Sequence, residues 1–176
     1  MVTAVEPPSE RRQAPADCIQ LVIFRLAGER YAVEVRWVRE IILPPDEVTI
    51  LPQSPKYLKG LFNLRNEVLP LVDLGACLGL TENPRNDDAR VILVEINEKT
   101  LGFLVGAVEA VSRVQRTRIG RPGIGLTSKR EYITGLVQMD EDLVILLAPE
   151  KLPLEELFIA DEGQPTAKPT QGIETL

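Results

Sequence analysis

The chain contains two copies of one pattern, and this duplication constrains the fold more strongly than any local preference. Residues 22–41 (VIFRLAGERYAVEVRWVREI) align without a gap with residues 92–111 (ILVEINEKTLGFLVGAVEAV). Residues 57–72 (YLKGLFNLRNEVLPLV) align in the same way with residues 132–147 (YITGLVQMDEDLVILL), with Tyr, Gly and Leu in matching places. Because apolar positions mostly fall on apolar positions, we predict a scaffold built from a duplicated unit.

The apolar segments within each copy are short, and this favours strands over helices. They are rich in Val, Ile, Leu and Phe and are bounded by turns such as Ala27-Gly28-Glu29. Each copy supplies about five strands, and closing five strands into a barrel removes the exposed sheet edges. We therefore predict a mainly β fold (all-β class) with short helices, made of two small five-stranded β-barrels packed together. Residues 20–26 and 90–96 contain the apolar runs LVIF and VILV, which predict burial inside a barrel on one face and partial cover by the sister barrel on the other.

The two ends of the chain differ in composition from the part between them. Residues 1–16 and 161–176 are rich in proline and polar residues, so we expect disordered tails there. The folded part is expected to run from residue 17 to residue 160. We expect the first barrel at about 22–84 and the second at about 90–150, with the option that the N-terminal and C-terminal segments cross between barrels.

Composition excludes several kinds of site. The chain of 176 residues has no histidine, which removes the commonest general base, the Ser-His-Asp and Cys-His pairs, and every zinc site that uses histidine. Two cysteines, Cys18 and Cys77, are too few for a metal site or a disulfide framework. A net charge of −6 argues against nucleic acid or direct insertion into an anionic membrane. The start of the chain does not read as a secretory signal, so we expect a cytoplasmic protein without catalytic residues, metal or cofactor.

An enzyme would have to use carboxylates. Glu67, Asp73, Asp87 and Asp88 are the candidates, but Asp73 directly precedes the short segment LGACLGL and is better placed to cap it. Asp87 and Asp88 lie in a polar linker. The Gly-rich basic stretch at 116–131 does not match a phosphate-binding loop.

A small β-barrel that binds nucleic acid is a further alternative, because such barrels stack bases on surface aromatic rings beside basic side chains. Trp37, Tyr31, Tyr57 and Tyr132 fall within or beside apolar strand segments, however, and we expect them to pack in the core.

The tripeptide Arg65-Asn66-Glu67 interrupts a run of strand-forming residues. Its spacing favours a hairpin turn with Asn66 at positive φ and charged neighbours in solvent. Arg65 aligns with Asp140 of the second copy, and Glu40 aligns with Ala110. Packing therefore does not dictate the charge at these two positions.

The turn and its surroundings resemble a known family. The segments YAVEVRWVREI and VTILPQSPKYLKGLFNLRNEVLPLVDLGACL are similar to CheW-type coupling proteins of bacterial chemotaxis, whose hallmark is NLRG-x-(I/V)-x-P-(I/V)-(I/V)-D-L. The resemblance covers roughly residues 18–158. Leu71 replaces Ile or Val, and Asn66 stands where the family usually has Gly, a change that a left-handed turn position tolerates.

The resemblance implies an adaptor with two SH3-like β-barrels and no enzymatic activity. Its partners would be the regulatory domain of a CheA-type histidine kinase and the cytoplasmic tip of chemoreceptors, and the chain alone would be a monomer. Glu40 and Arg65 would form a charge pair at the groove between the barrels. An adaptor of a system that controls twitching or gliding motility is an alternative within the same class. By carry-over, the expected protein-binding residues are Val35, Val38, Glu40, Lys59, Gly60, Asn63, Arg65 and Asn66.

Overall fold

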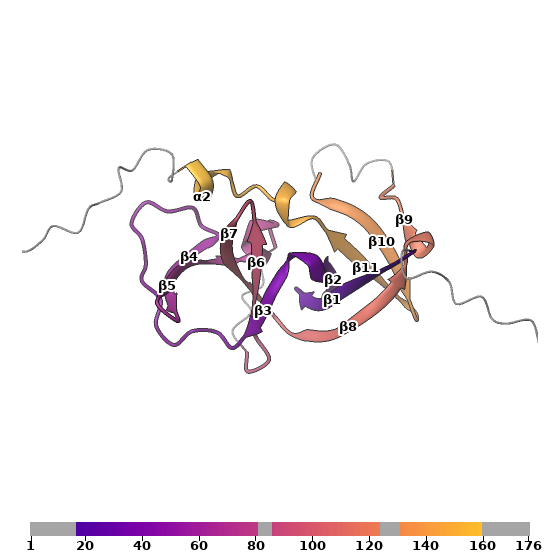
Figure 1. The fold of residues 1–176 in the computed structure, drawn as a ribbon, viewed down its shortest axis with the longest axis horizontal. Helices are drawn as coiled ribbons and strands as arrows, with labels where there is room; N and C mark the ends of the chain where they lie inside the picture. Colours follow the sequence, from indigo (N-terminus) through magenta and orange to yellow (C-terminus); the bar gives the residue numbers. More distant parts are fainter. Residues whose placement is uncertain (1–16, 81–85, 124–130, 160–176) are drawn as a thin grey trace, which may run out of the picture.

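The computed structural model describes residues 17–80, 86–123 and 131–159, and the predicted tails lie outside these ranges. Two β-sheets are curled into barrels that lie side by side along the longest axis (Figure 1). The strands are β1 (Cys18–Leu26), β2 (Glu29–Glu34), β3 (Val38–Ile42), β4 (Leu58–Leu64), β5 (Glu67–Asp73), β6 (Arg90–Ile96), β7 (Lys99–Val105), β8 (Val108–Gln115), β9 (Ile119–Gly120), β10 (Ile133–Met139) and β11 (Asp142–Leu147). The helical turns are η2 (Val35–Trp37), α1 (Leu74–Cys77), η3 (Arg116–Arg118), η4 (Pro149–Lys151) and α2 (Glu155–Ile159). The predicted fold class is confirmed, except that one sheet has six strands, because the two-residue strand β9 is added to it.

The two barrels do not divide the chain at about 22–84 and 90–150, and they follow the option that the N-terminal and C-terminal segments cross between barrels. One sheet has the order β3-β6-β7-β5-β4 and uses a continuous stretch of chain; we call it the continuous barrel. The other has the order β8-β1-β2-β11-β10-β9 and combines the two ends of the folded part; we call it the split barrel. The physical reason is that η2 directs β3 away from its own hairpin to pair with β6, while β8 pairs with β1 in return.

The strand registers reproduce the duplication. Leu21 pairs with Ser112 between β1 and β8, and the equivalent positions, Val91 and Ile42, pair between β6 and β3. The register also shifts at equivalent places in the second hairpin of each copy, at Leu58/Gly60 and at Ile133/Gly135. The two copies have therefore exchanged strands while keeping the same local geometry.

Three apolar clusters hold the molecule together: one inside each barrel and one between them. Along β1, Leu21 and Ile23 belong to the interior of the split barrel, whereas Val22 and Phe24 belong to the cluster between the barrels. The equivalent residues of β6 divide in the same way: Val91 and Leu93 lie inside the continuous barrel, and Ile92 and Val94 lie between the barrels. The predicted burial of both strands on two faces is confirmed. Each buried side chain of this size contributes about 1.5–3 kcal/mol to stability, so the shared layer makes the two barrels one cooperative body.

Candidate protein-binding surface

The β4–β5 turn is a two-residue hairpin that consists of Arg65 and Asn66, between the paired residues Leu64 and Glu67. Asn66 has a φ of 67°, as expected, and Arg65 has a φ of 50°. A tight hairpin turn that follows the strand twist needs positive φ at both central residues, which the sequence analysis had assigned only to Asn66. The Asn63 side-chain oxygen accepts a hydrogen bond from the Asn66 N–H at 3.2 Å and so supports the turn.

The turn places Arg65 against Glu40 of β3. Arg65 Nη1 donates to Glu40 Oε2 at 3.0 Å, and Nη2 donates to Oε1 at 2.8 Å, which is the two-pronged geometry that a guanidinium makes with a carboxylate. A second ion pair lies beside it with the charges exchanged, because here the arginine is on β3: Arg39 Nη1 donates to Glu67 Oε2 at 3.0 Å. All four residues belong to the continuous barrel. The two pairs tie the hairpin tip to the edge strand β3.

The Glu40–Arg65 pair stays open to solvent. The Arg65 side chain is 70% exposed and that of Glu40 is 31% exposed. A pair with this exposure contributes only about 0–1 kcal/mol to the fold. Its main effect is to hold a cation and an anion in a defined orientation on the surface.

Val35 and Val38 lie where the chain crosses from the split barrel to the continuous one. Both side chains are half-buried and pack against the cluster between the barrels. Val35 also lines a hollow of about 450 Å³, together with Cys18, Ile19, Gln20, Glu34, Arg36 and Arg113. This hollow offers a partly apolar contact beside the crossing segment.

Lys59 and Gly60 were expected on a surface that meets a partner, and the structure corrects this for Gly60. Gly60 is buried, with a φ of 144°, and a Cβ added to it would lie 2.3 Å from the backbone oxygen of Thr49. The close approach of the Thr49 segment, which pairs with Leu61, excludes any side chain here. The Lys59 side chain is one-third exposed, and its Nζ lies 3.5 Å from Asp73 Oδ2.

Asp73 caps α1, as predicted. Its Oδ1 accepts a hydrogen bond from the Ala76 N–H at 3.0 Å, and it is the one buried charged residue in the described part of the chain. Both carboxylate oxygens are therefore used within the fold. Across the same ranges, no group of three or more His, Cys, Asp and Glu side chains is placed to hold a metal ion.

Three of the four tested aromatic rings pack as expected. Tyr31 is buried, and Tyr57 and Tyr132 are half-buried against the cluster between the barrels. Trp37 differs, because it is half-exposed and the Arg36 guanidinium lies 4.8 Å from its ring centroid. One ring covered by an arginine does not make a platform for stacked bases.

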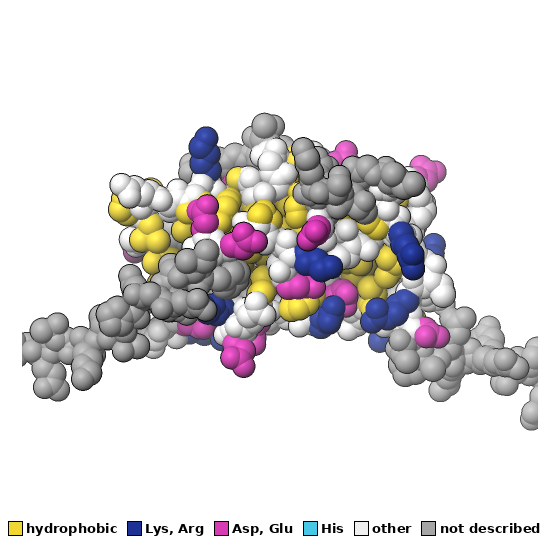
Figure 2. Space-filling model, turned by 90° about the horizontal axis from the view of Figure 1, so that it is seen from above, with side chains coloured by type: hydrophobic (Ala, Val, Ile, Leu, Met, Phe, Trp, Pro, Cys, Tyr) yellow, Lys and Arg dark blue, Asp and Glu magenta, His cyan; other side chains and the backbone are white. Residues whose placement is uncertain are grey.

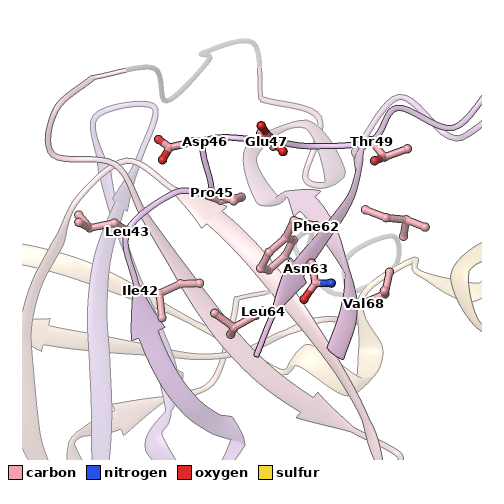
Figure 3. Close-up of a pocket in the computed structure, with 11 residues that line it drawn as sticks. Ile42, Leu43, Pro45, Asp46, Glu47, Thr49, Phe62, Asn63, Leu64 and Val68 are labelled. Atoms are coloured by element: carbon pink, nitrogen blue, oxygen red, sulfur yellow. The ribbon is translucent and has the colours of Figure 1, made fainter. Parts of the chain in front are cut away.

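The sequence analysis missed an apolar face on the continuous barrel. Ile41, Leu43 and Val68 are 36%, 67% and 62% exposed, and Leu43 and Val68 border a depression of about 640 Å³ (Figure 3). Phe62 lies in this depression, and Asp46 and Glu47 lie on the loop above it. Apolar residues in a strand usually belong to the core, so their presence alone did not reveal this face. The adjacent residues Ile41 and Ile42 were the one signal, because neighbouring residues of a strand point to opposite faces and this pair puts an apolar side chain on each face of an edge strand.

Cys77 is predicted to be unreactive in the folded protein. Burial, with a smaller effect from the Asp73 carboxylate, raises the pKa of its thiol to about 11. The thiol of the unfolded chain loses its proton at a lower pH than the thiol of the folded protein. Protonated Cys77 therefore stabilises the fold below pH 9, and this contribution is lost as the pH rises towards 11. Mass spectrometry after iodoacetamide treatment at pH 8 should show Cys77 modified at least about tenfold faster in urea than in buffer. Equal rates in the two solvents would contradict the burial.

Comparison with known proteins agrees with the fold. A family model described as CheW-like domain matches residues 20–156. The probable chemotaxis protein CheW of Rhizobium etli is 33% identical over 148 residues, which are 82% of this chain and 90% of that protein. Chemotaxis protein CheW of Klebsiella aerogenes is 30% identical over 81% of this chain and 86% of that protein. The crystal structure of the scaffolding protein TtCheW from Thermoanaerobacter tengcongensis superposes with a TM-score of 0.68 at 28% identity, covering 74% of this chain and 88% of that one.

The family model spans most of the folded part, including both barrels and the hairpin that carries Arg65. None of the helices in the described ranges has the length and apolar character needed to cross a bilayer. The chain belongs to the CheW-like family.

Proposed function

We propose that this chain is a non-enzymatic adaptor that couples chemoreceptors to a CheA-type histidine kinase in bacterial chemosensory signalling. It would bind the regulatory domain of the kinase and the cytoplasmic tip of the receptors. It would be a cytoplasmic monomer on its own and join membrane-bound receptor arrays through these partners. Relatives that are named as chemotaxis proteins, and a structural neighbour that is named as a scaffolding protein, support this proposal.

The observation that carries the proposal is the exposed pair of Glu40 and Arg65. The fold positions Arg65 in a left-handed turn conformation and aligns it with two hydrogen bonds, although the pair adds little stability. The equivalent positions of the second copy are Ala110 and Asp140, so the duplicated scaffold does not require the pair. An oriented guanidinium is well suited to selecting a partner and fixing its orientation.

An apolar residue next to the pair provides contact area. Val68 lies just beyond the turn in β5 and is 62% exposed. Exposed apolar side chains bordered by charges have the composition of a reversible protein interface. We infer that the surface of Glu40, Arg65 and Val68 binds one partner, and that the hollow at Val35 contributes to a second contact.

The adaptor role places the phosphotransfer chemistry in the kinase. Histidine is absent from the sequence, so this chain cannot supply the phosphorylated residue of a histidine kinase. Two of the four carboxylates that a reaction could recruit are committed to the fold: Asp73 caps α1 and Glu67 pairs with Arg39.

The proposal is tested by a binding experiment with the intact chain as bait. Immobilised chain should retain the host's CheA-type kinase and its receptors from detergent extracts, and an Arg65→Ala variant with an unchanged melting curve should retain at least about tenfold less of one of them. Lys151→Ala, a substitution at an exposed lysine of η4, is the matched control. Retention of neither a kinase nor a receptor by the native chain would overturn the proposal.

A further inference from the structure

One edge of the split barrel carries an unusual concentration of positive charge. Residues 111–123 contain four arginines and no acidic residue, in a chain whose net charge is −6. They lie on β8, on η3 and after β9, where the chain passes from one edge of the sheet to the other and closes the barrel. We call this set the arginine corner; its members are Arg113, Arg116, Arg118 and Arg121, and all four are exposed.

The arginine corner differs from the other described arginines, which pair with carboxylates or, in the case of Arg90, donate to the backbone oxygens of Asp87 and Ala89. Arg25 and Arg30 pair with Glu109, Arg36 pairs with Glu34, and Arg39 and Arg65 have the carboxylate partners described above. Within the described part of the chain, the four arginines of the corner make no ion pair and no side-chain hydrogen bond. Figure 2 shows several dark-blue side chains on the half of the molecule that the split barrel forms. Their charge is therefore available to a partner.

The duplication shows that the fold does not require this charge. The equivalent loop of the continuous barrel runs from β3 to the Thr49–Leu61 bridge, just as the corner runs from β8 to the pairing of Gly120 with Leu136. That loop, LPPDEVTI at 43–50, carries Asp46 and Glu47 and no basic residue. The equivalent position in the scaffold thus accepts either sign of charge, so packing does not account for the positive charge of the corner.

The surroundings of the corner narrow the class of partner. Exposed charges act over about one Debye length, roughly 8–10 Å, so a short anionic segment senses the corner while the acidic residues elsewhere are screened. An extended polyanion or a membrane surface would also meet the rest of a molecule whose net charge is −6. Arg113 lines the hollow at Val35, and Val111, which is 57% exposed, lies two residues away on the same face of β8.

We infer that the arginine corner binds an acidic segment of a protein partner, in which carboxylates face the arginines and an apolar side chain contacts Val111 and the hollow. This contact lies on the split barrel, separate from the Glu40–Arg65 surface. It would supply a salt-sensitive contribution to encounter and orientation of the partner.

The experiment uses the intact ¹⁵N-labelled chain and a peptide of ten glutamates as the probe. In about 20 mM salt the peptide should shift the backbone amides of residues 111–121, and the apparent affinity should fall at least about tenfold in 300 mM salt. The variant R113Q/R116Q/R118Q/R121Q should lose at least about tenfold in affinity at low salt. The control K56Q/K151Q, which removes exposed lysines elsewhere, should bind as the native chain does. A ten-glutamine peptide should cause no shift.

Three results would overturn the inference. The first is that the glutamate peptide fails to bind or shifts amides outside the corner. The second is that a DNA oligonucleotide or phosphatidylserine vesicles bind the corner at lower concentration than the peptide does. The third is that sedimentation shows a dimer that the fourfold variant abolishes, because the occupant would then be a second copy of the chain. None of these bears on retention of kinase or receptor by Arg65, so the two proposals fail separately.

Discussion

Replacing Gly60 by alanine is expected to lower the free energy of unfolding by roughly 3–5 kcal/mol. The new Cβ would lie 2.3 Å from the Thr49 oxygen and 2.7 Å from a methyl group of Val48, and the backbone would have to keep a φ of 144°. Overpacking and backbone strain of this kind each cost about 1–3 kcal/mol, and here they act at one site. Urea denaturation followed by tryptophan fluorescence measures the change directly, since Trp37 is the only tryptophan.

Gly28→Ala is the matched control for this substitution. Gly28 lies in the β1–β2 turn with a φ of 81°, but nothing lies within 4 Å of the position that its Cβ would take. It therefore carries the left-handed strain without the clash, and we expect a loss of about 1–2 kcal/mol. If Gly60→Ala proved as mild as Gly28→Ala and instead abolished partner binding, Gly60 would belong to the binding surface and not to the close contact between β4 and the Thr49 segment.

The strand pairing separates what the sequence could predict about this fold from what it could not. The duplicated pattern predicted two small barrels, because strand length and apolar alternation are local properties that survive in both copies. It did not predict which hairpin each third strand joins. The two copies present equivalent hairpins, so the pairing of β3 with β6 and that of β3 with β1 have the same local pattern and differ only in tertiary structure.

For individual residues, comparing the two copies separates those that the scaffold requires from those that it does not. Arg65 and Glu40 could be singled out because the two copies differ in charge there, and the structure joins them with two hydrogen bonds. Gly60 has its counterpart in Gly135, which also approaches a neighbouring segment closely. A residue that both copies share in this way reflects the scaffold. Positions where the copies differ are better candidates for function.

Reversing the charge of Arg65 is expected to abolish assembly while leaving the fold intact. In Arg65→Glu the new carboxylate faces Glu40, so the pair becomes repulsive, at a cost of about 1 kcal/mol because both side chains reach solvent. A partner that binds the oriented guanidinium instead meets two carboxylates. Placing like charges opposite each other at an interface costs several kcal/mol. The measurement is kinase activity in a reconstituted mixture of receptor, kinase and chain, where we expect the chain concentration that gives half-maximal activation to rise at least about a hundredfold.

The swapped variant E40R/R65E separates two reasons for such a loss. It restores an opposite-charge pair between β3 and the turn, so it should recover the native melting temperature in either case. If the pair acts only by holding the hairpin tip against β3, the swap also recovers kinase activation. If Arg65 itself contacts the partner, activation stays lost, because the guanidinium now projects from β3, whose backbone direction and neighbours differ. We expect the second outcome, since the native Arg65 side chain is 70% exposed and leaves most of its donors available. Full activation by R65E alone would show that the oriented charge pair has no part in assembly.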